Sequence, residues 1–516
     1  FQTRWLTGMD PADIIRSIFF YISERQANMT KINWKITWGL AVTVLFLVLL
    51  AVRLGLFKDQ SATIPSGPKA EIVRHPESWM NIYQNRKKIG VIHRTYQALE
   101  NGRFQTTENV TMQINTMGIT QALHISTETE LNPDMSFSSF HFQLNSSLFR
   151  FNARGYKQKD QIILFAGPPR EEEKIILPIS DVPHISGNIY EAAFRAGLKK
   201  NQSSSFSIFD PSTLGIRKIS VTRDADEIIP IMGKRILTQK FCADFMGAKN
   251  CAWLAKDGEV LKESGILGLS MEKVSEELAR KEFAMDNVID FTQVASIPSN
   301  QIFQDPASLT EITIRISNIH PSGLMLNGGR QKFHQDLLTV TRELIPIENA
   351  TEGKMPSFFK HFLKPSPLVQ SDHPQIKAAM AKMVSRGDSP SGKMRKIVSW
   401  VYKNIQKKPA LSVPNALEVL KNRTGDCNEH AVLTAALLRS AGVPAQIETG
   451  LVYLNGRFYY HAWNLAYVGQ WITADAVFNQ IPADVTHIRL VRGEGSQQLD
   501  LLGVMGKIKL EVISAK

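Results

Sequence analysis

The pattern of hydrophobic and polar residues divides the chain into a short N-terminal part, a long alternating part and a helix-rich C-terminal part. Residues 36–52 read ITWGLAVTVLFLVLLAV, without a charged residue, and the apolar run continues to Phe57 with Arg53 as its interruption. About 20 apolar residues are enough to cross the hydrocarbon core of a bilayer as a helix. The pattern therefore predicts a single transmembrane helix over residues 36–57.

Residues 1–35 precede this run and include an amphipathic segment between residues 9 and 29. In a helix its apolar side chains form one stripe, which would lie on the inner leaflet or pack on an integral-membrane partner. These side chains are Ile14, Ile15, Ile18, Phe19 and Ile22. Basic residues slightly favour the N-terminal side of the run, which places the N-terminus in the cytoplasm. We expect a single-pass protein of a bacterial inner membrane, with residues 1–35 cytoplasmic and the bulk of the chain periplasmic.

Residues 58–70, KDQSATIPSGPKA, are rich in Ser, Pro and Gly and predict a linker. From residue 71 to about 345, apolar and polar residues alternate with period two, as in QALHISTETEL and SFHFQLN. Turn signals such as Asn101-Gly102 and Asp257-Gly258 separate the runs, which is typical of antiparallel hairpins. The alternation predicts a mostly antiparallel β region with more than one sheet, interrupted by a helix at residues 273–283. Its role stays open between a binding module and a spacer.

The chain contains three cysteines, of which Cys242 and Cys251 lie close together in FCADFMGAKNCAW. In an oxidising compartment these two could form a disulfide, whereas the alternative is a pair of buried thiols. Two cysteines without further ligands at a fixed spacing do not make a zinc site. Because the β region also lacks a glycine-rich phosphate loop, we expect neither a metal nor a cofactor.

Prolines are dense between residues 346 and 371, which predicts a second linker before a separate domain at residues 372–516. Helical patterns there cover residues 375–385, 391–403 and 415–420, and a further helix is ended by Gly442 and Pro444. Cys427 lies in the first turn of that further helix. The helix dipole and the unpaired amides at this position favour the thiolate. The alternative for a lone cysteine is a small buried core residue.

Three strands are predicted after this helix, at residues 447–454, 457–465 and 471–476, with Asn455-Gly456 as a hairpin turn. The second strand carries His461 and the third carries Asp475. If His461 lies directly opposite Asp475, a loop of five residues remains, and the imidazole and the carboxylate are neighbours on one face of the sheet. A cysteine at a helix N-terminus facing that pair provides a nucleophile, a base and an orienting group.

Three motifs follow one another in this domain. They are Gly-x-Cys-x-Glu-His-Ala at residues 425–431, His-Ala-Trp at 461–463 and Trp-x-x-x-Asp at 471–475. Together they resemble the transglutaminase-like superfamily of papain-like fold, over roughly residues 372–490. The resemblance implies an α+β domain in which Cys427 is the nucleophile, His461 the general base and acid, and Asp475 the residue that orients His461.

The chemistry that the resemblance implies is acyl transfer through a thioester. We therefore expect a membrane-anchored cysteine peptidase or acyltransferase that acts on amide bonds of envelope proteins or peptides. The alternative is a non-catalytic periplasmic subunit of a larger inner-membrane complex, in which the papain-like and β domains bind a partner. The formal net charge of +12 would also fit nucleic acid. We expect no such partner, because no basic cluster is interleaved with aromatic residues and the charge lies beyond the predicted span.

Overall fold

The computed structural model describes residues 75–516, except residues 117, 147–149, 168–171, 246–247, 282–289, 319–323, 347–355, 410–414, 495–500 and 502–503. The predicted cytoplasmic segment 1–35, the predicted membrane span 36–57 and the predicted linker 58–70 lie outside the described residues. Contacts divide the chain into one unit at residues 1–63 and a second unit at residues 64–516. All elements below belong to the second unit.

The predicted fold class is not supported in its first element, the single transmembrane helix. Among the described residues, no helix is long and apolar enough to cross a membrane. The longest described helix, α7 (Pro390–Asn404), has 15 residues, fewer than the roughly 20 that a spanning helix needs. The part of the chain that the structure describes is mostly β, and its C-terminal portion combines strands with helices.

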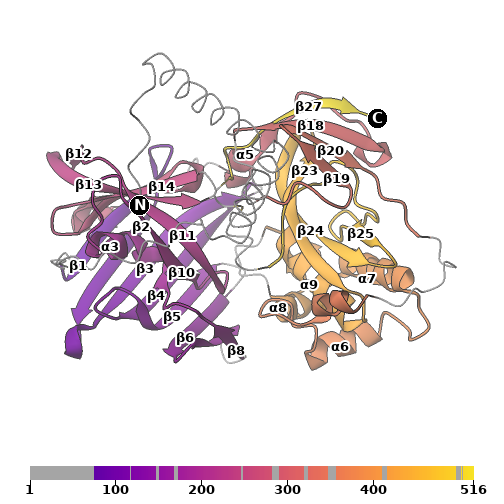
Figure 1. Cartoon of the computed structure of the whole chain (residues 1–516), viewed down its shortest axis with the longest axis horizontal. Helices are drawn as coiled ribbons and strands as arrows, with labels where there is room; N and C mark the ends of the chain where they lie inside the picture. The colour runs from indigo at the N-terminus through magenta and orange to yellow at the C-terminus, as the bar shows by residue number, and fades with distance from the viewer. Residues whose placement is uncertain are drawn as a thin grey trace, which may run out of the picture. The chain divides into compact units, whose positions relative to one another are not determined.

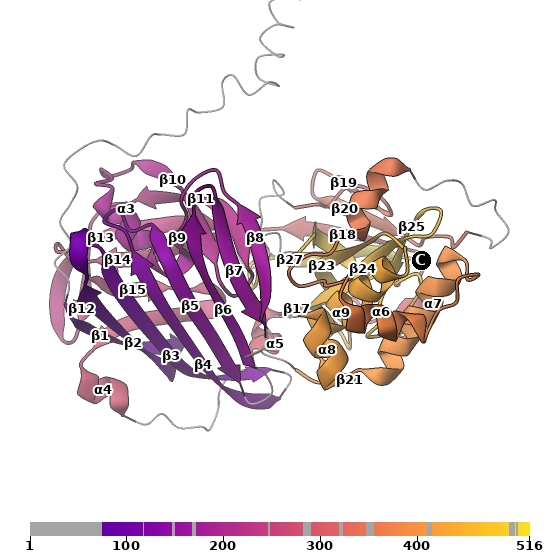
Figure 2. The ribbon, with the colours of Figure 1, turned by 90° about the horizontal axis from the view of Figure 1, so that it is seen from below.

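The first sheet contains 16 strands, and β1 to β8 lie side by side in chain order (Figure 2). The strands are β1 (Glu77–Gln84), β2 (Lys87–Ala98), β3 (Phe104–Thr116), β4 (Ile119–Leu131), β5 (Phe137–Ser146), β6 (Arg150–Gln158), β7 (Gln161–Gly167), β8 (Glu173–Pro178), β9 (His184–Ile185), β10 (Ser203–Asp210), β11 (Gly215–Arg223), β12 (Glu227–Ile231), β13 (Lys234–Phe245), β14 (Ala248–Leu254), β15 (Val260–Ser264) and β16 (Leu269–Val274). Nearly all pairs are antiparallel, as the alternating pattern predicts; β9 and β10 are parallel.

The core of this sheet encloses a short helix, α3 (Ile189–Arg195). Ile189 to Phe194 are all buried, and the apolar residues among them share one cluster with strands β1 to β7, β10, β11 and β13 to β15. A helix that is buried on every side lies inside a core rather than on a surface. The sheet therefore wraps around α3, and one apolar core holds its two ends together.

The predicted helix at residues 273–283 is wrong over its first residues. Strand β16 includes Lys273 and Val274, and only Glu276–Arg280 form a helix, α4. The reason is pairing with a distant strand, because β16 hydrogen-bonds to β1, with Met80 opposite Lys273. Pairing of this kind overrides the local helical pattern.

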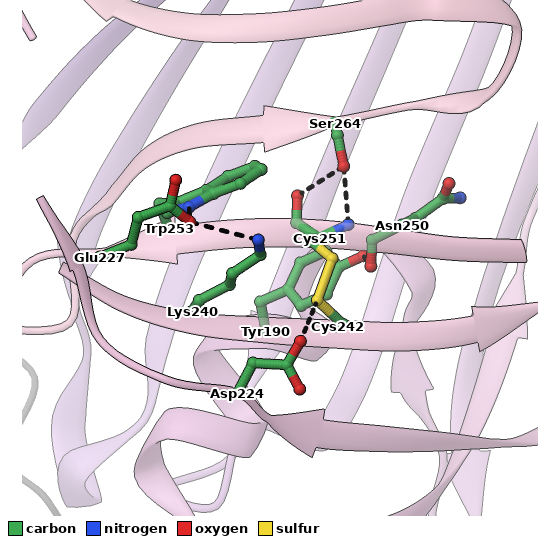
Figure 3. The surroundings of a disulfide bond; sticks show 9 residues. All are labelled: Tyr190, Asp224, Glu227, Lys240, Cys242, Asn250, Cys251, Trp253 and Ser264. Atoms are coloured by element: carbon green, nitrogen blue, oxygen red, sulfur yellow. Dashed lines mark hydrogen bonds and ion pairs between the residues drawn. A yellow bond between two sulfur atoms is a disulfide. The ribbon is translucent and has the colours of Figure 1, made fainter. Parts of the chain in front are cut away.

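Cys242 and Cys251 form a disulfide between neighbouring strands of the first sheet (Figure 3). They are direct cross-strand partners in β13 and β14, with Cα atoms 4.1 Å apart. Next to the disulfide, the hydroxyl of Tyr190 in α3 donates a 2.8 Å hydrogen bond to the carbonyl of Asn250. Of the two sequence alternatives for this pair, the structure contains the disulfide, and Cys427 is the free cysteine.

The described C-terminal portion contains two larger sheets, with helices packed beside one of them (Figure 1). One sheet has the order β17-β24-β23-β26 with β25 also paired to β24, and the other has the order β19-β20-β18-β27. Their strands are β17 (Ile297–Pro298), β18 (Glu311–Ser317), β19 (Gln331–His334), β20 (Leu337–Thr341), β23 (Ala445–Leu454), β24 (Arg457–Tyr467), β25 (Trp471–Ala474), β26 (Ile488–Arg492) and β27 (Lys509–Ala515). A small pair joins β21 (Gln406–Lys407) to β22 (Thr424–Gly425).

The remaining elements are helices. The α-helices not yet given are α5 (Phe291–Ala295), α6 (Pro374–Ala381), α8 (Ala416–Asn422) and α9 (Cys427–Ser440), and the 3-10 helices are η1 (Glu100–Gly102), η2 (Ser186–Asn188), η3 (Ile266–Gly268), η4 (Pro306–Ser308) and η5 (Ser357–Leu363). Helix α7 buries the face that the sequence predicts, which consists of Met394, Ile397, Val398 and Val401. Helix α9 packs against β23 and β24 in one apolar cluster with α6, α7 and α8.

A second cluster joins the two C-terminal sheets. In β18 the buried residues Ile312, Ile314 and Ile316 alternate with more exposed ones, as a half-buried strand requires. They pack with residues of β23, β24 and β26, among them Leu451 and Phe458. The predicted β-rich region 71–345 therefore contributes to two different cores. Its last strands complete the C-terminal domain, which begins well before residue 372.

We expect the double variant Cys242→Ala/Cys251→Ala to unfold at a lower temperature than the wild type. For a closed loop of about ten residues, the lost constraint on the unfolded chain corresponds to about 2–3 kcal/mol. Calorimetry with and without a reductant measures the effect. The reductant should lower the wild-type transition and leave the double variant unchanged. A wild-type protein with three alkylatable cysteines and no response to the reductant would contradict the disulfide.

Candidate active site

Helix α9 begins at Cys427 because the residue before it caps the helix. The carboxylate of Asp426 accepts a hydrogen bond from the amide of Asn428, and the amide of Asp426 donates to Oε2 of Glu429, both at 2.8 Å. This reciprocal arrangement is a capping box. Gly425 is required beside it, since a Cβ there would lie 2.2 Å from the Cβ of Glu429. The cap fixes the first residue of the helix and with it the place of the Cys427 sulfur.

Cys427 is half-buried, and its sulfur accepts a hydrogen bond from the amide of Ala462 in β24. Burial raises the pKa of the Cys427 thiol well above its ordinary value, and the nearby carboxylates, Asp475 among them, act in the same direction. The predicted preference for the thiolate at the helix start is therefore wrong for the resting site. Desolvation and negative charge outweigh the helix dipole, which favours the thiol over the thiolate.

His461, the residue before Ala462, is hydrogen-bonded to Asp475. Its Nε2 lies 2.6 Å from Oδ2 of Asp475, and both side chains are buried. The register differs from the predicted one, because Tyr467 faces Trp471 and a loop of only three residues lies between them. Strand β25 ends one residue before Asp475. The carboxylate therefore reaches His461 diagonally, from just beyond the strand end.

Both carboxylate oxygens of Asp475 are occupied. Oδ1 accepts hydrogen bonds from the amides of Val477 at 2.6 Å and Phe478 at 3.2 Å. Oδ2 lies 2.6 Å from His461 Nε2 and 2.9 Å from His487 Nε2. Burial alone would raise the pKa of Asp475, but the charges and hydrogen bonds of the two histidines outweigh it and hold that pKa well below its ordinary range. The ionised form of Asp475 is therefore favoured at neutral pH.

His487 is the residue of this site that the sequence does not reveal. It is fully buried, and its Nδ1 lies 3.1 Å from Oδ1 of Asp484 while its Nε2 faces Asp475. Burial would lower the pKa of His487, but the two carboxylates outweigh burial and raise that pKa to about 9. Asp484 also accepts the amide and the hydroxyl of Thr486. The Asp484-x-Thr486 spacing is a local turn signal, but no pattern in the sequence relates it to Asp475.

The second C-terminal sheet holds the loop that carries Asp484 and His487. Arg330, which lies just before β19, donates hydrogen bonds to the carbonyls of Ala483 and His487. Its guanidinium is 4% exposed and also pairs with Glu343 at 3.0 Å. One buried guanidinium thus fixes the loop at both ends, so its geometry depends on residues far outside the motif region.

The cluster of His461, Asp475 and His487 has the residue types of a metal site, but its geometry does not fit one. Ligands at about 2.0–2.1 Å from a tetrahedral zinc ion lie roughly 3.3 Å apart. Here the facing atoms are 2.6 and 2.9 Å apart, which are hydrogen-bond distances. We therefore treat the cluster as a hydrogen-bonded chain.

The polar groups of three neighbouring residues are bonded to the surrounding fold. Nδ1 of His430 lies 2.7 Å from the carbonyl of Asp426, one turn before it in α9. The indole of Trp463 donates a 2.9 Å hydrogen bond to Glu448, and its ring is stacked at 6.2 Å from that of His461. Asn464 points to the other side and bonds to the backbone of α9. These three side chains surround the site, and their contacts are structural.

Comparison with known proteins gives one family. Residues 377–476 match the model of the transglutaminase-like superfamily. A candidate cysteine protease from Cytophaga hutchinsonii is 19% identical, with 40% of this chain and 86% of that chain covered and a TM-score of 0.27. A candidate protease from Parabacteroides distasonis is 10% identical, with 73% and 65% covered and a TM-score of 0.18.

A further solved structure is similar to part of the chain. A β-barrel-like protein from Brucella abortus, whose domain has no known function, is 12% identical, with 40% of this chain and 98% of that chain covered and a TM-score of 0.31. With TM-scores this low, the structural likenesses carry no functional argument. No curated protein matches the chain.

We expect Gly425→Ala to destabilise the start of α9 by about 1–3 kcal/mol, as an overpacked position does. The added methyl group displaces Glu429, which opens the capping box and moves Cys427. Thermal unfolding and the rate of Cys427 alkylation measure the two effects. Gly387→Ala is the matched control, because a Cβ there meets no atom within 4 Å. Equal behaviour of the two variants would show that the close approach does not matter.

We expect the stability of the domain to fall as the pH rises through about 9. The pKa of His487 is raised from 6.5 to about 9 in the folded state. Its contribution, about 3 kcal/mol, is therefore fully present below about pH 6.5 and lost above pH 9. Unfolding midpoints between pH 6 and pH 10 measure it, and His487→Gln should flatten this part of the profile. His184→Gln, which removes a buried histidine of the first sheet, should not.

Proposed function

The chain carries a transglutaminase-like superfamily domain at residues 377–476, and from this premise we propose that it is a cysteine peptidase or acyltransferase acting on amide bonds of proteins or peptides. The single observation that carries the proposal is the buried hydrogen bond of 2.6 Å between His461 and Asp475. It lies beside the Cys427 sulfur, because the amide of the next residue, Ala462, is hydrogen-bonded to that sulfur. In this proposal the nucleophile comes from helix α9, the base from β24 and the orienting carboxylate from the residue after β25.

In the proposed mechanism His461 removes the thiol proton as Cys427 attacks. A carboxylate only accepts hydrogen bonds, so Nε2 of His461 carries a proton toward Asp475, and Nδ1 is left as the basic nitrogen. The Cys427 thiol is held neutral by burial, so the sulfur gains nucleophilicity only as Nδ1 takes the proton. Asp475 stabilises the imidazolium that results.

The acyl group then passes through a thioester. The sulfur forms a bond to the amide carbonyl carbon, and the negative charge on its oxygen is stabilised by the amide of Cys427, the first of helix α9. The C–N bond breaks as His461 returns its proton to the leaving amine. Water attacks the thioester in a peptidase and an amine attacks it in an acyltransferase. In both cases His461 takes the proton of the attacking group, the bond between the sulfur and the acyl carbon breaks, and His461 returns the proton to the sulfur.

Envelope proteins or peptides are the substrate class that we propose. The support is the disulfide in the first sheet of the same chain, because disulfides persist in oxidising compartments outside the cytosol. In such a compartment, the amide bonds available to the site are those of envelope proteins and peptides. The first sheet would act as a binding module for them.

We expect Cys427→Ala and His461→Ala each to lower kcat/KM for an amide substrate by roughly 10³-fold or more, as removal of a nucleophile or its base does. A peptide library, incubated with and without an added primary amine and read by mass spectrometry, distinguishes hydrolysis from acyl transfer. A cysteine-directed probe should label Cys427 of the wild type and leave the disulfide pair unlabelled.

Cys427→Ser is the matched control for folding, since it changes one atom of the side chain. If Cys427→Ala cells and wild-type cells show the same envelope proteins and the same growth, while deletion of the domain is harmful, the catalytic proposal fails. The domain would then bind a partner instead of transforming a substrate.

A further inference from the structure

His487 contacts Asp475, as His461 does, and has a second carboxylate, that of Asp484, as a neighbour. Its Nε2 is 2.9 Å from Oδ2 of Asp475, and its Nδ1 is 3.1 Å from Oδ1 of Asp484. All three side chains are buried. The groups that face the imidazole are therefore a carboxylate at each nitrogen, the ring of His461 at 5.7 Å and the rings of Trp463 and Phe478.

The hydrogen-bonding pattern determines the charge of His487. A neutral imidazole has one N–H donor and one acceptor nitrogen, whereas a carboxylate offers acceptors alone. Both ring nitrogens of His487 face carboxylate oxygens, so both must carry a proton. Asp484 is held in the acceptor state, because its Oδ1 also receives the amide and hydroxyl of Thr486. The geometry thus requires an imidazolium, and the raised pKa of His487 agrees with it.

We propose that His487 is a positioning residue, an imidazolium that holds the Asp475 carboxylate toward His461 and lowers the basicity of His461. This inference rests on the proposed function of the same site. With His487 charged, the chain of His461, Asp475, His487 and Asp484 carries one net negative charge when His461 is neutral. Without the charge on His487 it would carry two, and His461 would bind its proton more tightly.

The lowered basicity suits the reaction. A base that must take the thiol proton and then release it to the leaving amine works best when its pKa lies near the working pH. A carboxylate beside His461 that no other cation shared would attract the proton of His461 more strongly. Sharing Oδ2 of Asp475 with His487 divides the attraction of that carboxylate between two cations.

The scaffold around His487 supports the same role. The guanidinium of Arg330 binds the His487 carbonyl at 3.0 Å. Gly450, the cross-strand partner of His461, has no room for a side chain, because a Cβ would lie 1.9 Å from the carbonyl oxygen of Ile488. The backbone beside His487 is thus brought directly against the strand pair that carries His461.

Titration of the histidines in the full chain, labelled with nitrogen-15 at histidine and read by NMR, tests the proposal without a substrate. In the wild type both ring nitrogens of His487 should stay protonated to about pH 9. In His487→Gln the pKa of His461 should rise by about one unit or more, as expected for the loss of a nearby buried charge. In His184→Gln, the control, it should not change.

Asp484→Asn provides a second variant in case His487→Gln does not fold. It keeps the size of the side chain and removes one of the two charges that hold the proton, so the pKa of His487 should fall by at least one unit. A neutral His487 at pH 7 in the wild type, or an unchanged His461 pKa in a folded His487→Gln protein, would overturn the proposal and leave His487 with a purely structural role.

Enzyme kinetics then separate this inference from the proposed function. In His487→Gln the limb of the kcat/KM profile that reports His461 should move to higher pH, with KM little changed. A loss of activity without a shift of that limb would also overturn the proposal. A wild type that shows no amidase or acyltransferase activity, but in which His461 still responds to His487→Gln, would refute the proposed function and leave the coupling between the two histidines established.

Discussion

The candidate site depends on one buried carboxylate, that of Asp475. A carboxylate without contact with water is costly unless every oxygen is hydrogen-bonded and its charge is balanced. Two backbone amides occupy one oxygen of Asp475 and two imidazoles share the other. The hydrogen bond to His461 therefore offsets part of the cost of burying Asp475, and the same bond orients the imidazole. The stability of the fold and the orientation of His461 are therefore coupled through Asp475.

The elements that satisfy Asp475 come from widely separated parts of the chain. His461 lies in β24, the two amides lie in the turn after β25, and His487 lies directly before β26. Arg330 comes from the second sheet, more than a hundred residues earlier, and binds the loop that carries His487. The geometry of the three motif residues thus depends on surrounding residues that lie outside the motifs. The site therefore forms only when the two C-terminal sheets pack together and Arg330 reaches the loop that carries His487.

Much of this site could be predicted from local patterns. The cap at Asp426, the helix from Cys427 and the hairpin at Asn455 each follow from a few neighbouring residues, and the structure contains all three. The alternation in the β region likewise predicted antiparallel strands. Strand pairing at residues 269–274 was not visible, because it depends on β1 almost two hundred residues away.

Other features depended on three-dimensional surroundings. The position of Cys427 at the start of a helix predicted a thiolate. The burial and the carboxylates that raise the pKa of this thiol come together only in the folded domain. The exact register of Asp475 was missed for a smaller reason. A three-residue loop and a five-residue loop keep the same side chains on the same face, so alternation could not choose between them. His487 has no sequence signal, because its partners converge only after β25 and β26 pack.

The pairing of β18 with β27 determines which segment of the chain can fold as one unit. The matched stretch of residues 377–476 contains the cysteine, the histidine and the aspartate, yet strands β18 and β27 flank it on both sides in the sequence and are hydrogen-bonded to each other. The amide of Thr310 bonds to the carbonyl of Lys516, so the last residue of the chain is tied to a segment two hundred residues before it. The matched stretch therefore lies between two strands of one sheet. Cutting the chain at the proline-rich linker would separate β18 from β27 and expose an apolar face, so the unit that folds as a whole is the longer segment that both strands delimit.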